Sequence, residues 1–288
     1  MSAAELATRG SFAIRYWGVR GSIATPGPGT LRYGGNTSCV EIRCGDQRFV
    51  LDAGTGIRGL GDQLLATGDP VRLTLLFSHL HWDHIQGLPF FLPAYQDSTE
   101  LTIGCARREG VRLHDVLENQ MTYPTSPVEF DEVCTATFNL LEFDAGETLT
   151  FGDVTVRTAL LNHPGQATAY RFEYKGASFV HATDHEHGNE VIDAGLVGLA
   201  QGADYLSYDS SYTEEEYAGV RGQAHIGWGH STWEEAVKVA QRAEASNLVL
   251  FHHDPTHNDD QMDAIHAQAK EQFPQTLVAR EGMEILLA

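Results

Sequence analysis

The stretch HLHWDH, residues 79–84, is the most informative part of this chain, because it holds three histidines and an aspartate within six positions. Imidazole and carboxylate groups at this density are typical ligands of zinc, manganese or iron. The apolar run before it predicts a buried strand, after which a tight turn would direct His79 and His81 at one metal ion. A helix that begins near Asp83 would direct Asp83 and His84 at a second ion. The stretch therefore predicts a metal site rather than a polar surface loop.

Short apolar runs recur along the chain, and several of them end at an acid or a histidine. Strands are predicted over residues 48–52, 71–77, 154–160, 169–174, 177–181, 204–208 and 247–251. Helices are predicted over residues 189–201, 231–245 and 260–273. Ser231 and Glu234 predict a capping box for the second of these helices. This mixture predicts packed sheets with helices outside them and functional loops at one sheet edge.

The length allows one large domain or two small ones, and we expect a single domain over residues 1–288, with residues 1–11 as a flexible tail. Hydrophobic residues make up 42% of the chain, and a chain of this size can bury about three quarters of its unfolded surface. The four cysteines form no CxxC pair, and the N-terminal residues contain no apolar signal segment. We therefore expect a cytoplasmic protein with reduced cysteines and no membrane partner.

The net charge is −20, from 19 Lys and Arg against 39 Asp and Glu. Affinity for nucleic acid comes largely from Lys and Arg side chains that neutralise phosphates, so this charge argues against DNA or RNA. We therefore expect that a long nucleic acid is not a partner. For the oligomeric state the sequence offers only the general prior of a homodimer.

Five motifs in order resemble those of the metallo-β-lactamase superfamily. HLHWDH fits the HxHxDH motif of that family, and single residues fit the other four: Asp52 in LDAG, His163 in LLNHPG, Asp184 in ATDH and His252 in LVLFHHD. Each of them follows a predicted strand. The resemblance implies an α/β (α+β) fold, a four-layer αββα sandwich. It also implies a hydrolase with two divalent metal ions, Zn²⁺ first and Mn²⁺ or Fe²⁺ as alternatives.

The resemblance also implies how the ligands divide between the two ions. One ion would be held by His79, His81 and His163, and the other by Asp83, His84 and His252, with Asp184 as a bridge. Asp52 would support the site without contacting an ion. His253 is an alternative to His252, because both lie at the end of the same strand. The other clustered histidines match no ligand position, and we expect them beside the ligands or at the surface: His181, His185 and His187.

A second pair of residues resembles the acid and the HST histidine of ribonuclease Z and its phosphodiesterase relatives. His230 lies in GHST before a predicted helix, and Asp209 lies in YDSSYT after a predicted strand. The resemblance implies that Asp209 orients His230, which would contact a phosphoryl oxygen or protonate the leaving alkoxide. An aspartate stands here where ribonuclease Z typically has a glutamate. The candidate catalytic residues are therefore His230, Asp209 and Asp83.

The segment between the third and fourth motifs is too short for the arm with which ribonuclease Z commonly grips tRNA. Together with the net charge, this favours a small phosphodiester, such as a cyclic nucleotide, as the substrate. A hydroxide shared by the two ions would attack the phosphorus. The alternatives are an acyl hydrolase of the thioesterase, lactonase or glyoxalase-II type, and a metal-stabilised binding or sensor protein.

Two further segments are expected to shape the pocket around the ions. Residues 21–35 form a loop rich in glycine and proline, and long loops in compact domains are often functional. Residues 107–137 match no motif and are expected to line or cover the site with a helix. Trp82, inside the HLHWDH stretch, is expected to pack against the protein rather than to contact a substrate.

Overall fold

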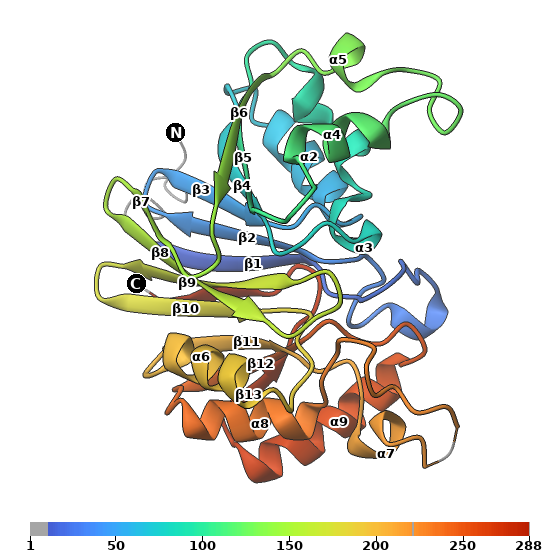
Figure 1. Cartoon of the computed structure of the whole chain (residues 1–288), viewed down its shortest axis with the longest axis vertical. Coiled ribbons are helices and arrows are strands. Elements are labelled where there is room, and N and C mark those ends of the chain that lie inside the picture. The colour runs from blue at the N-terminus through green and yellow to red at the C-terminus, as the bar shows by residue number, and fades with distance from the viewer. Residues whose placement is uncertain (1–10, 221, 288) are drawn as a thin grey trace.

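The computed structural model describes residues 11–220 and 222–287, and it shows two sheets packed face to face between layers of helices (Figure 1). Each sheet has seven strands and combines parallel with antiparallel pairs. Because each sheet buries one face against the other sheet and one face under helices, the layers follow the order helix, sheet, sheet, helix. This arrangement confirms the expected four-layer αββα sandwich.

The first sheet is built from the N-terminal half of the chain and one C-terminal strand. In spatial order its strands are β14 (Glu284–Leu286), β1 (Phe12–Gly18), β2 (Cys39–Cys44), β3 (Gln47–Leu51), β4 (Arg72–Phe77), β5 (Glu100–Ala106) and β6 (Thr137–Phe143). The strands from β3 to β6 run parallel. The strands predicted over residues 48–52 and 71–77 correspond to β3 and β4.

The second sheet is built from the C-terminal half of the chain. In spatial order its strands are β13 (Thr276–Val278), β12 (Asn247–Phe251), β11 (Tyr205–Asp209), β10 (Ala177–Ala182), β9 (Ala167–Tyr174), β8 (Val154–Leu161) and β7 (Thr148–Phe151). The strands from β10 to β13 run parallel. All five strands predicted in this half are present, with ends that differ by two residues at most.

The helices lie mainly on the outer faces of the two sheets (Figure 1). Those of the first half are α2 (Ile57–Leu65), α3 (Trp82–Ile85), α4 (Leu113–Gln120) and α5 (Phe130–Val133), with the 3-10 turns η1 (Pro28–Thr30), η2 (Leu88–Phe90) and η3 (Leu92–Tyr95). Those of the second half are α6 (Glu190–Ala200), α7 (Glu214–Tyr217), α8 (Trp233–Arg242) and α9 (Asp259–Gln272). The three helices predicted from the sequence correspond to α6, α8 and α9.

The predicted cap of α8 is wrong by one residue. The N-cap is Thr232, whose side chain accepts a hydrogen bond from the Glu235 amide. The hydroxyl of Ser231 is instead occupied by Tyr208, which donates to it at 3.3 Å, and by the His187 ring at 2.9 Å. Because Ser231 is fully buried beneath these contacts, it is not available to cap the helix.

Large apolar side chains fill the space between the two sheets. Phe12, Tyr16, Phe49, Phe172 and Phe251 are among the side chains of this core that are fully buried. Two further clusters of apolar residues seal each sheet against its own helices. The alternation of strand residues between these cores fixes the register of each sheet, because a slip of one residue would exchange its two faces.

The carboxyl ends of the parallel strands place the polar motifs at one edge of the sandwich. Parallel strands end at the same edge of a sheet. Asp52 follows β3, His79 lies two residues after β4, Asp184 lies two residues after β10, and His252 follows β12. The fold therefore gathers residues that are up to 200 positions apart in the sequence.

The predicted flexible tail, residues 1–11, lies outside the described residues except for Ser11, which is buried. Among the described residues, no helix has the length and apolar character needed to cross a membrane.

Candidate metal centre

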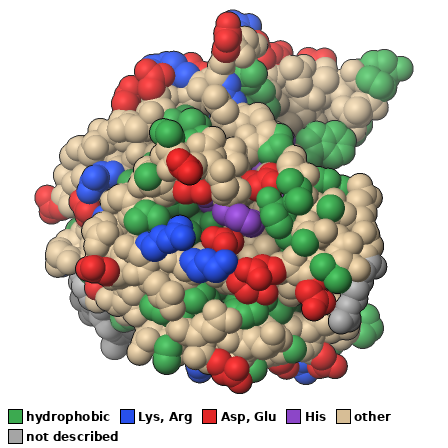
Figure 2. Space-filling model, turned by 60° about the horizontal axis from the view of Figure 1, so that its bottom comes forward, with side chains coloured by type: hydrophobic (Ala, Val, Ile, Leu, Met, Phe, Trp, Pro, Cys, Tyr) green, Lys and Arg blue, Asp and Glu red, His purple; other side chains and the backbone are tan. Residues whose placement is uncertain are grey.

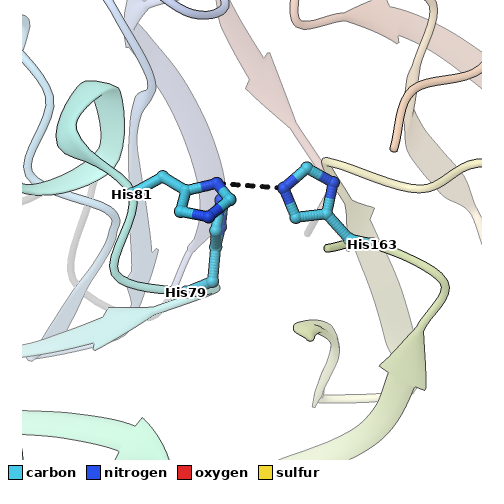
Figure 3. Close-up of side chains that lie close together, drawn as sticks. All are labelled: His79, His81 and His163. Carbon is cyan, nitrogen blue, oxygen red and sulfur yellow. Dashed lines mark hydrogen bonds between the residues drawn. The ribbon is translucent and has the colours of Figure 1, made fainter. Parts of the chain in front are cut away.

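Three histidines from two loops meet in a first cluster (Figure 3). His79 and His81 come from the loop after β4, and His163 comes from the loop after β8. Figure 3 shows the rings of the two loops turned toward each other, with Nε2 of His163 at 3.1 Å from Nδ1 of His81. One nitrogen from each ring lies within 4.8 Å of the other two. The structure thus brings together the three residues expected to hold one ion.

Hydrogen bonds on the far side of these rings fix which nitrogen faces the cluster. Nδ1 of His163 donates to the carbonyl of Gly229 at 2.8 Å, which leaves Nε2 directed inward. Nδ1 of His79 lies 3.1 Å from the Ser78 hydroxyl, and its Nε2 also faces inward. Contacts of this kind orient metal-binding histidines and set their tautomer.

A second cluster contains Asp83, His84, Asp184 and His252, all of them buried. Nε2 of His84 lies 3.1 Å from Oδ2 of Asp83 and 3.2 Å from Oδ2 of Asp184. Nε2 of His252 lies 3.4 Å and 3.2 Å from the same two oxygens. The structure therefore also brings together the residues expected around the other ion.

Asp184 stands between the two clusters. Its Oδ1 lies 3.7 Å from Nε2 of His79 and 3.8 Å from Nε2 of His163. Its Oδ2 faces His84 and His252 of the second cluster. Burial opposes the charge of this carboxyl, but the surrounding histidines hold its pKa well below the ordinary value. One carboxylate with an oxygen toward each cluster has the position of a bridging ligand.

The unsatisfied atoms of the site fit two divalent cations. Nε2 of His79, of His84 and of His252 is buried and has no hydrogen-bond partner among the described residues. A buried polar atom without a partner costs about 1–3 kcal/mol, and here three of them converge on carboxylates. Neutral imidazoles and ionised carboxylates are the donor set that binds zinc, manganese or iron. The arrangement is therefore suited to metal ions.

The backbone is strained where the ligand loops leave the strands. Asp52, Asp184 and His252 have φ angles of 62°, 58° and 62°, a left-handed conformation that is uncommon for residues other than glycine. Each lies within two residues of the end of a strand. Strain of this kind persists only where surrounding contacts enforce it, and it gathers at functional sites.

Residues that do not belong to either cluster hold the ligands in place. Asp52 accepts from Nδ1 of His84 at 2.7 Å and from the amide of Ser78 at 2.7 Å, as its expected supporting role requires. The amide of Ser22 donates to Oδ2 of Asp83 at 2.8 Å. The hydroxyl of Ser211 lies 3.1 Å from Nδ1 of His252. The three serines were not singled out by the sequence.

His230 and Asp209 form a buried pair beside the clusters. Nδ1 of His230 donates to Oδ2 of Asp209 at 2.8 Å and lies 3.8 Å from Oδ1 of Asp184. Burial alone would lower the pKa of His230, but the Asp209 carboxylate, with Asp184 and Asp83 beyond it, raises this pKa to about 9. The His230 side chain is 12% exposed, whereas Asp209 is fully buried. The shorter aspartate therefore reaches the histidine.

Glu186 connects three loops of the site, although no motif in the sequence pointed to it. Its carboxylate accepts from the amides of Gly227 at 2.6 Å and Gly229 at 2.8 Å. Gly229 in turn accepts from His163 through its carbonyl and directly precedes His230. A Cβ on Gly229, whose φ is +90°, would lie 2.3 Å from Nδ1 of His163. Only a glycine fits at this position.

The remaining histidines of interest lie outside both clusters. Nε2 of His253 donates to the carbonyl of Ala279 at 2.8 Å, so His252 is the residue of that pair that faces the site. His181 packs on Phe251 with ring centroids 4.8 Å apart. His185 lies 3.1 Å from Asp193, and His187 contacts Ser231 as described above.

Trp82 differs from the expectation, because it is 83% exposed and does not pack. It belongs to α3, whose next two residues, Asp83 and His84, are buried in the second cluster. The segment 107–137 contains α4 and α5, as the expected helix-containing insert requires.

Comparison with known proteins finds a matching family model and matching relatives. A family model described as the beta-lactamase superfamily domain matches residues 47–253. A ribonuclease Z from Gemmatimonas aurantiaca is 26% identical over 302 residues, which cover 87% of this chain and 90% of that protein.

Solved structures support the same fold. The metallo-beta-lactamase fold protein YhfI from Bacillus subtilis matches with a TM-score of 0.72 and 19% identity, covering 96% of this chain and 99% of that one. Human tRNase Z, short form, matches with a TM-score of 0.63 and 17% identity, covering 96% of this chain and 99% of that one.

These comparisons overturn the expectation that a long nucleic acid is not a partner. The curated relative from Gemmatimonas aurantiaca is a ribonuclease, and human tRNase Z shares the fold, although only the hairpin β9–β10 lies between His163 and Asp184. Net charge was a poor guide because it averages over the whole surface, whereas phosphates respond to the local field and to bound cations. Figure 2 shows acidic and basic side chains interspersed on one face.

Proposed function

The chain belongs to the beta-lactamase superfamily, and from this membership we propose that it is a hydrolase that uses two divalent metal ions to cleave a phosphodiester. The observation that carries the proposal is the His230–Asp209 pair, which lies beside both clusters and keeps a positive charge close to them. A cation that is also a proton donor suits a reaction in which negative charge grows on phosphoryl and alkoxide oxygens.

The described residues offer a complete set of ligands for the proposed ions. His79, His81 and His163 would hold one, Asp83, His84 and His252 the other, and Asp184 would contact both. We favour Zn²⁺ because most of these ligands are imidazoles, with Mn²⁺ or Fe²⁺ as alternatives. When bound, such ions lower the pKa of a water molecule and neutralise charge on phosphate oxygens.

The protein's own contribution to the reaction centres on His230. Its Nδ1–H is held by Asp209, so its second nitrogen is free to act on the substrate. The Asp209 carboxylate favours the ring that carries both protons. This ring can therefore donate a hydrogen bond to a phosphoryl oxygen and then pass a proton to the departing alkoxide. Asp209 stabilises the charged ring before the transfer and holds its orientation throughout.

Asp83 is proposed to act as a metal ligand and not to carry a proton. Its Oδ2 faces both His84 and His252 and accepts from the amide of Ser22. Burial opposes its charge, but the neighbouring histidines hold its pKa far below the ordinary value. Asp83 would therefore stay ionised and serve as a ligand that keeps the reacting water in position.

The proposal leaves two substrate classes to test. A small phosphodiester, such as a cyclic nucleotide, is one candidate. An RNA phosphodiester, as the name of the ribonuclease Z relatives suggests, is the other. Both present the same bond to the same residues.

The first experiment measures cleavage of bis-(p-nitrophenyl) phosphate by the purified protein after chelation and after addition of Zn²⁺ or Mn²⁺. We expect about two ions per chain and activity that returns with them. The substitution Val191→Ala serves as the control, because Val191 is exposed on α6 and belongs to neither cluster. Two bound ions with hydrolysis of thioesters or lactones but of no phosphodiester would refute the proposal.

A further inference from the structure

Helix α3 faces two different sites. Asp83 and His84 are buried in the second cluster. Trp82 and Gln86 line a separate cavity of about 510 Å³. Residues four positions apart share one face of a helix, so the wall of this cavity is the outer face of the helix that carries two of the proposed ligands. The cavity is therefore next to the metal centre.

Aromatic rings form one side of the cavity. Trp82, Phe90 and Tyr95 line it, and Trp82 and Phe90 are 83% and 65% exposed. The Tyr95 hydroxyl donates to the carbonyl of Pro89, so its ring rather than its hydroxyl is left for a ligand. Large apolar side chains that gather in a hollow are typical of a binding site.

Amide and hydroxyl groups complete the lining. Gln86, Asn119 and Gln120 contribute amides, and none of the described residues that line the cavity carries a charge. Nε2 of Gln120 donates to the carbonyl of Ile85 at 3.0 Å, while its Oε1 is buried and has no partner among the described residues. The cavity therefore suits a flat, neutral group whose edge can form hydrogen bonds with amides.

We propose that this cavity binds a nucleobase, and that the ester cleaved at the metal centre is a nucleoside phosphodiester. The inference rests on the proposed function. Bases stack on aromatic side chains and pair through their edges with amides. A purely apolar segment would make no use of the amides of Gln86 and Asn119, and a charged headgroup would find no opposite charge among the described lining residues.

The first test measures binding without metal or turnover. Tryptophan fluorescence is followed during titration of the chelated protein with adenosine monophosphate and, separately, with ribose 5-phosphate. We expect the nucleotide to quench the wild-type signal and ribose 5-phosphate to leave it unchanged. Trp82→Leu should remove the quench. Trp228→Leu is the matched control, since Trp228 is also exposed but is not part of the cavity lining. An equal quench in Trp82→Leu would overturn the proposal.

The second test uses kinetics. The ratio of kcat/KM for adenosine 5′-(p-nitrophenyl) phosphate to that for methyl p-nitrophenyl phosphate reports what the base contributes. We expect Phe90→Ala and Asn119→Ala each to lower this ratio about tenfold, because base stacking and pairing commonly have effects of this size. Val191→Ala, at an exposed position on α6, should leave the ratio unchanged.

The outcomes separate this inference from the proposed function. If the metal-loaded protein cleaves neither ester, the proposed function fails. If it cleaves both and the ratio is the same in wild type and variants, only the nucleobase pocket fails. If the variants do lower the ratio, competition by 3′,5′-cyclic AMP and by a short oligoribonucleotide distinguishes the two sources of a nucleoside phosphodiester. Competition that is weakened equally by Phe90→Ala and by Val191→Ala would also count against the pocket.

Discussion

The charge of His230 depends on one neighbour. Burial would favour the neutral ring, and the Asp209 carboxylate at 2.8 Å reverses that preference. A buried ion pair of this kind costs free energy to form and is therefore weak evidence for a stabilising role. The position of the His230–Asp209 pair beside Asp184 is more simply explained by a role in the reaction.

We predict that His230→Ala lowers kcat for phosphodiester cleavage by about 10²–10⁴-fold, the usual contribution of a positioned acid. The variant should still bind both ions, because His230 is not needed by either cluster expected to hold them. Metal content by elemental analysis and kcat are measured on the same preparation. Unchanged kcat with both ions bound would remove His230 from the mechanism.

At the same scale, the sequence predicted the residues that carry a recognisable motif and missed those that act through distant contacts. The stretch from His79 to His84 is recognisable because three histidines and an aspartate lie close together after an apolar strand. Ser22 and Glu186 do not, because they reach the site only through contacts with Asp83 and Gly229, which are 61 and 43 positions away. Trp82 was misread for a related reason, since an aromatic residue between buried ligands normally packs.

The loop before α8 is the element on which the two histidines His163 and His230 depend together. Glu186 holds its amides, and the Gly229 carbonyl holds the ring of His163. A small displacement of this loop would move a proposed ligand and the proposed acid at once.

Gly229→Ala is therefore expected to lower metal affinity by about 10–100-fold, the range seen when supporting contacts of metal ligands are lost. Gly227→Ala is the matched control. Both glycines have a φ near +90°, but a Cβ on Gly227 would meet no atom within 4 Å, whereas one on Gly229 would strike His163. Zn²⁺ affinity is measured by competition with a chromogenic chelator. Equal losses in the two variants would mean that backbone strain, and not the clash, is responsible.

The pattern of the two faces explains only part of which strands were predicted, because β1, β2 and β5 are largely buried and yet were not predicted. The residues of β12 are almost all apolar, and those of β8 alternate between apolar and polar. Both strands were predicted. β6 sits at a sheet edge with most of its residues exposed or half-buried, and β14 has three residues, so neither gives a periodic signal. The cap of α8 was misplaced because serine is intrinsically the better cap, and only the tertiary contacts of Ser231 leave the role to Thr232.

For the whole molecule, the two sheets contribute to the metal centre together. The loops after β4 supply His79 to His84, and loops of the second sheet supply His163, Asp184 and His252. The ions would therefore join the two halves of the sandwich, and binding should stabilise the folded state as a whole.

We predict that Zn²⁺ at about 100 times its Kd adds about 2.7 kcal/mol per ion to the free energy of unfolding, a rise in Tm of several degrees for a chain of this size. Differential scanning calorimetry of chelated and reloaded protein measures this change. Asp184→Asn should lose most of the rise, because Asp184 faces both clusters, while Val191→Ala, at an exposed position on α6, should retain it. A Tm that does not respond to metal in the wild type would contradict the prediction.

The net charge of the chain illustrates what a whole-molecule quantity leaves out. A value of −20 predicted a poor partner for nucleic acid, yet the relatives include ribonuclease Z. The family, the layers and the confirmed class of hydrolase were all accessible from ordered motifs. The substrate depends on the local shape of the site, which no sum over residues describes.

The division of the ligands between the two sheets has a consequence for biosynthesis. Among the proposed ligands His252 comes last in the sequence, so a polypeptide emerging from the ribosome carries an incomplete set of donors until this residue has been made. The second sheet must form and dock before both ions can be retained. Metal capture would then separate molecules in which the two sheets have docked from those in which they have not.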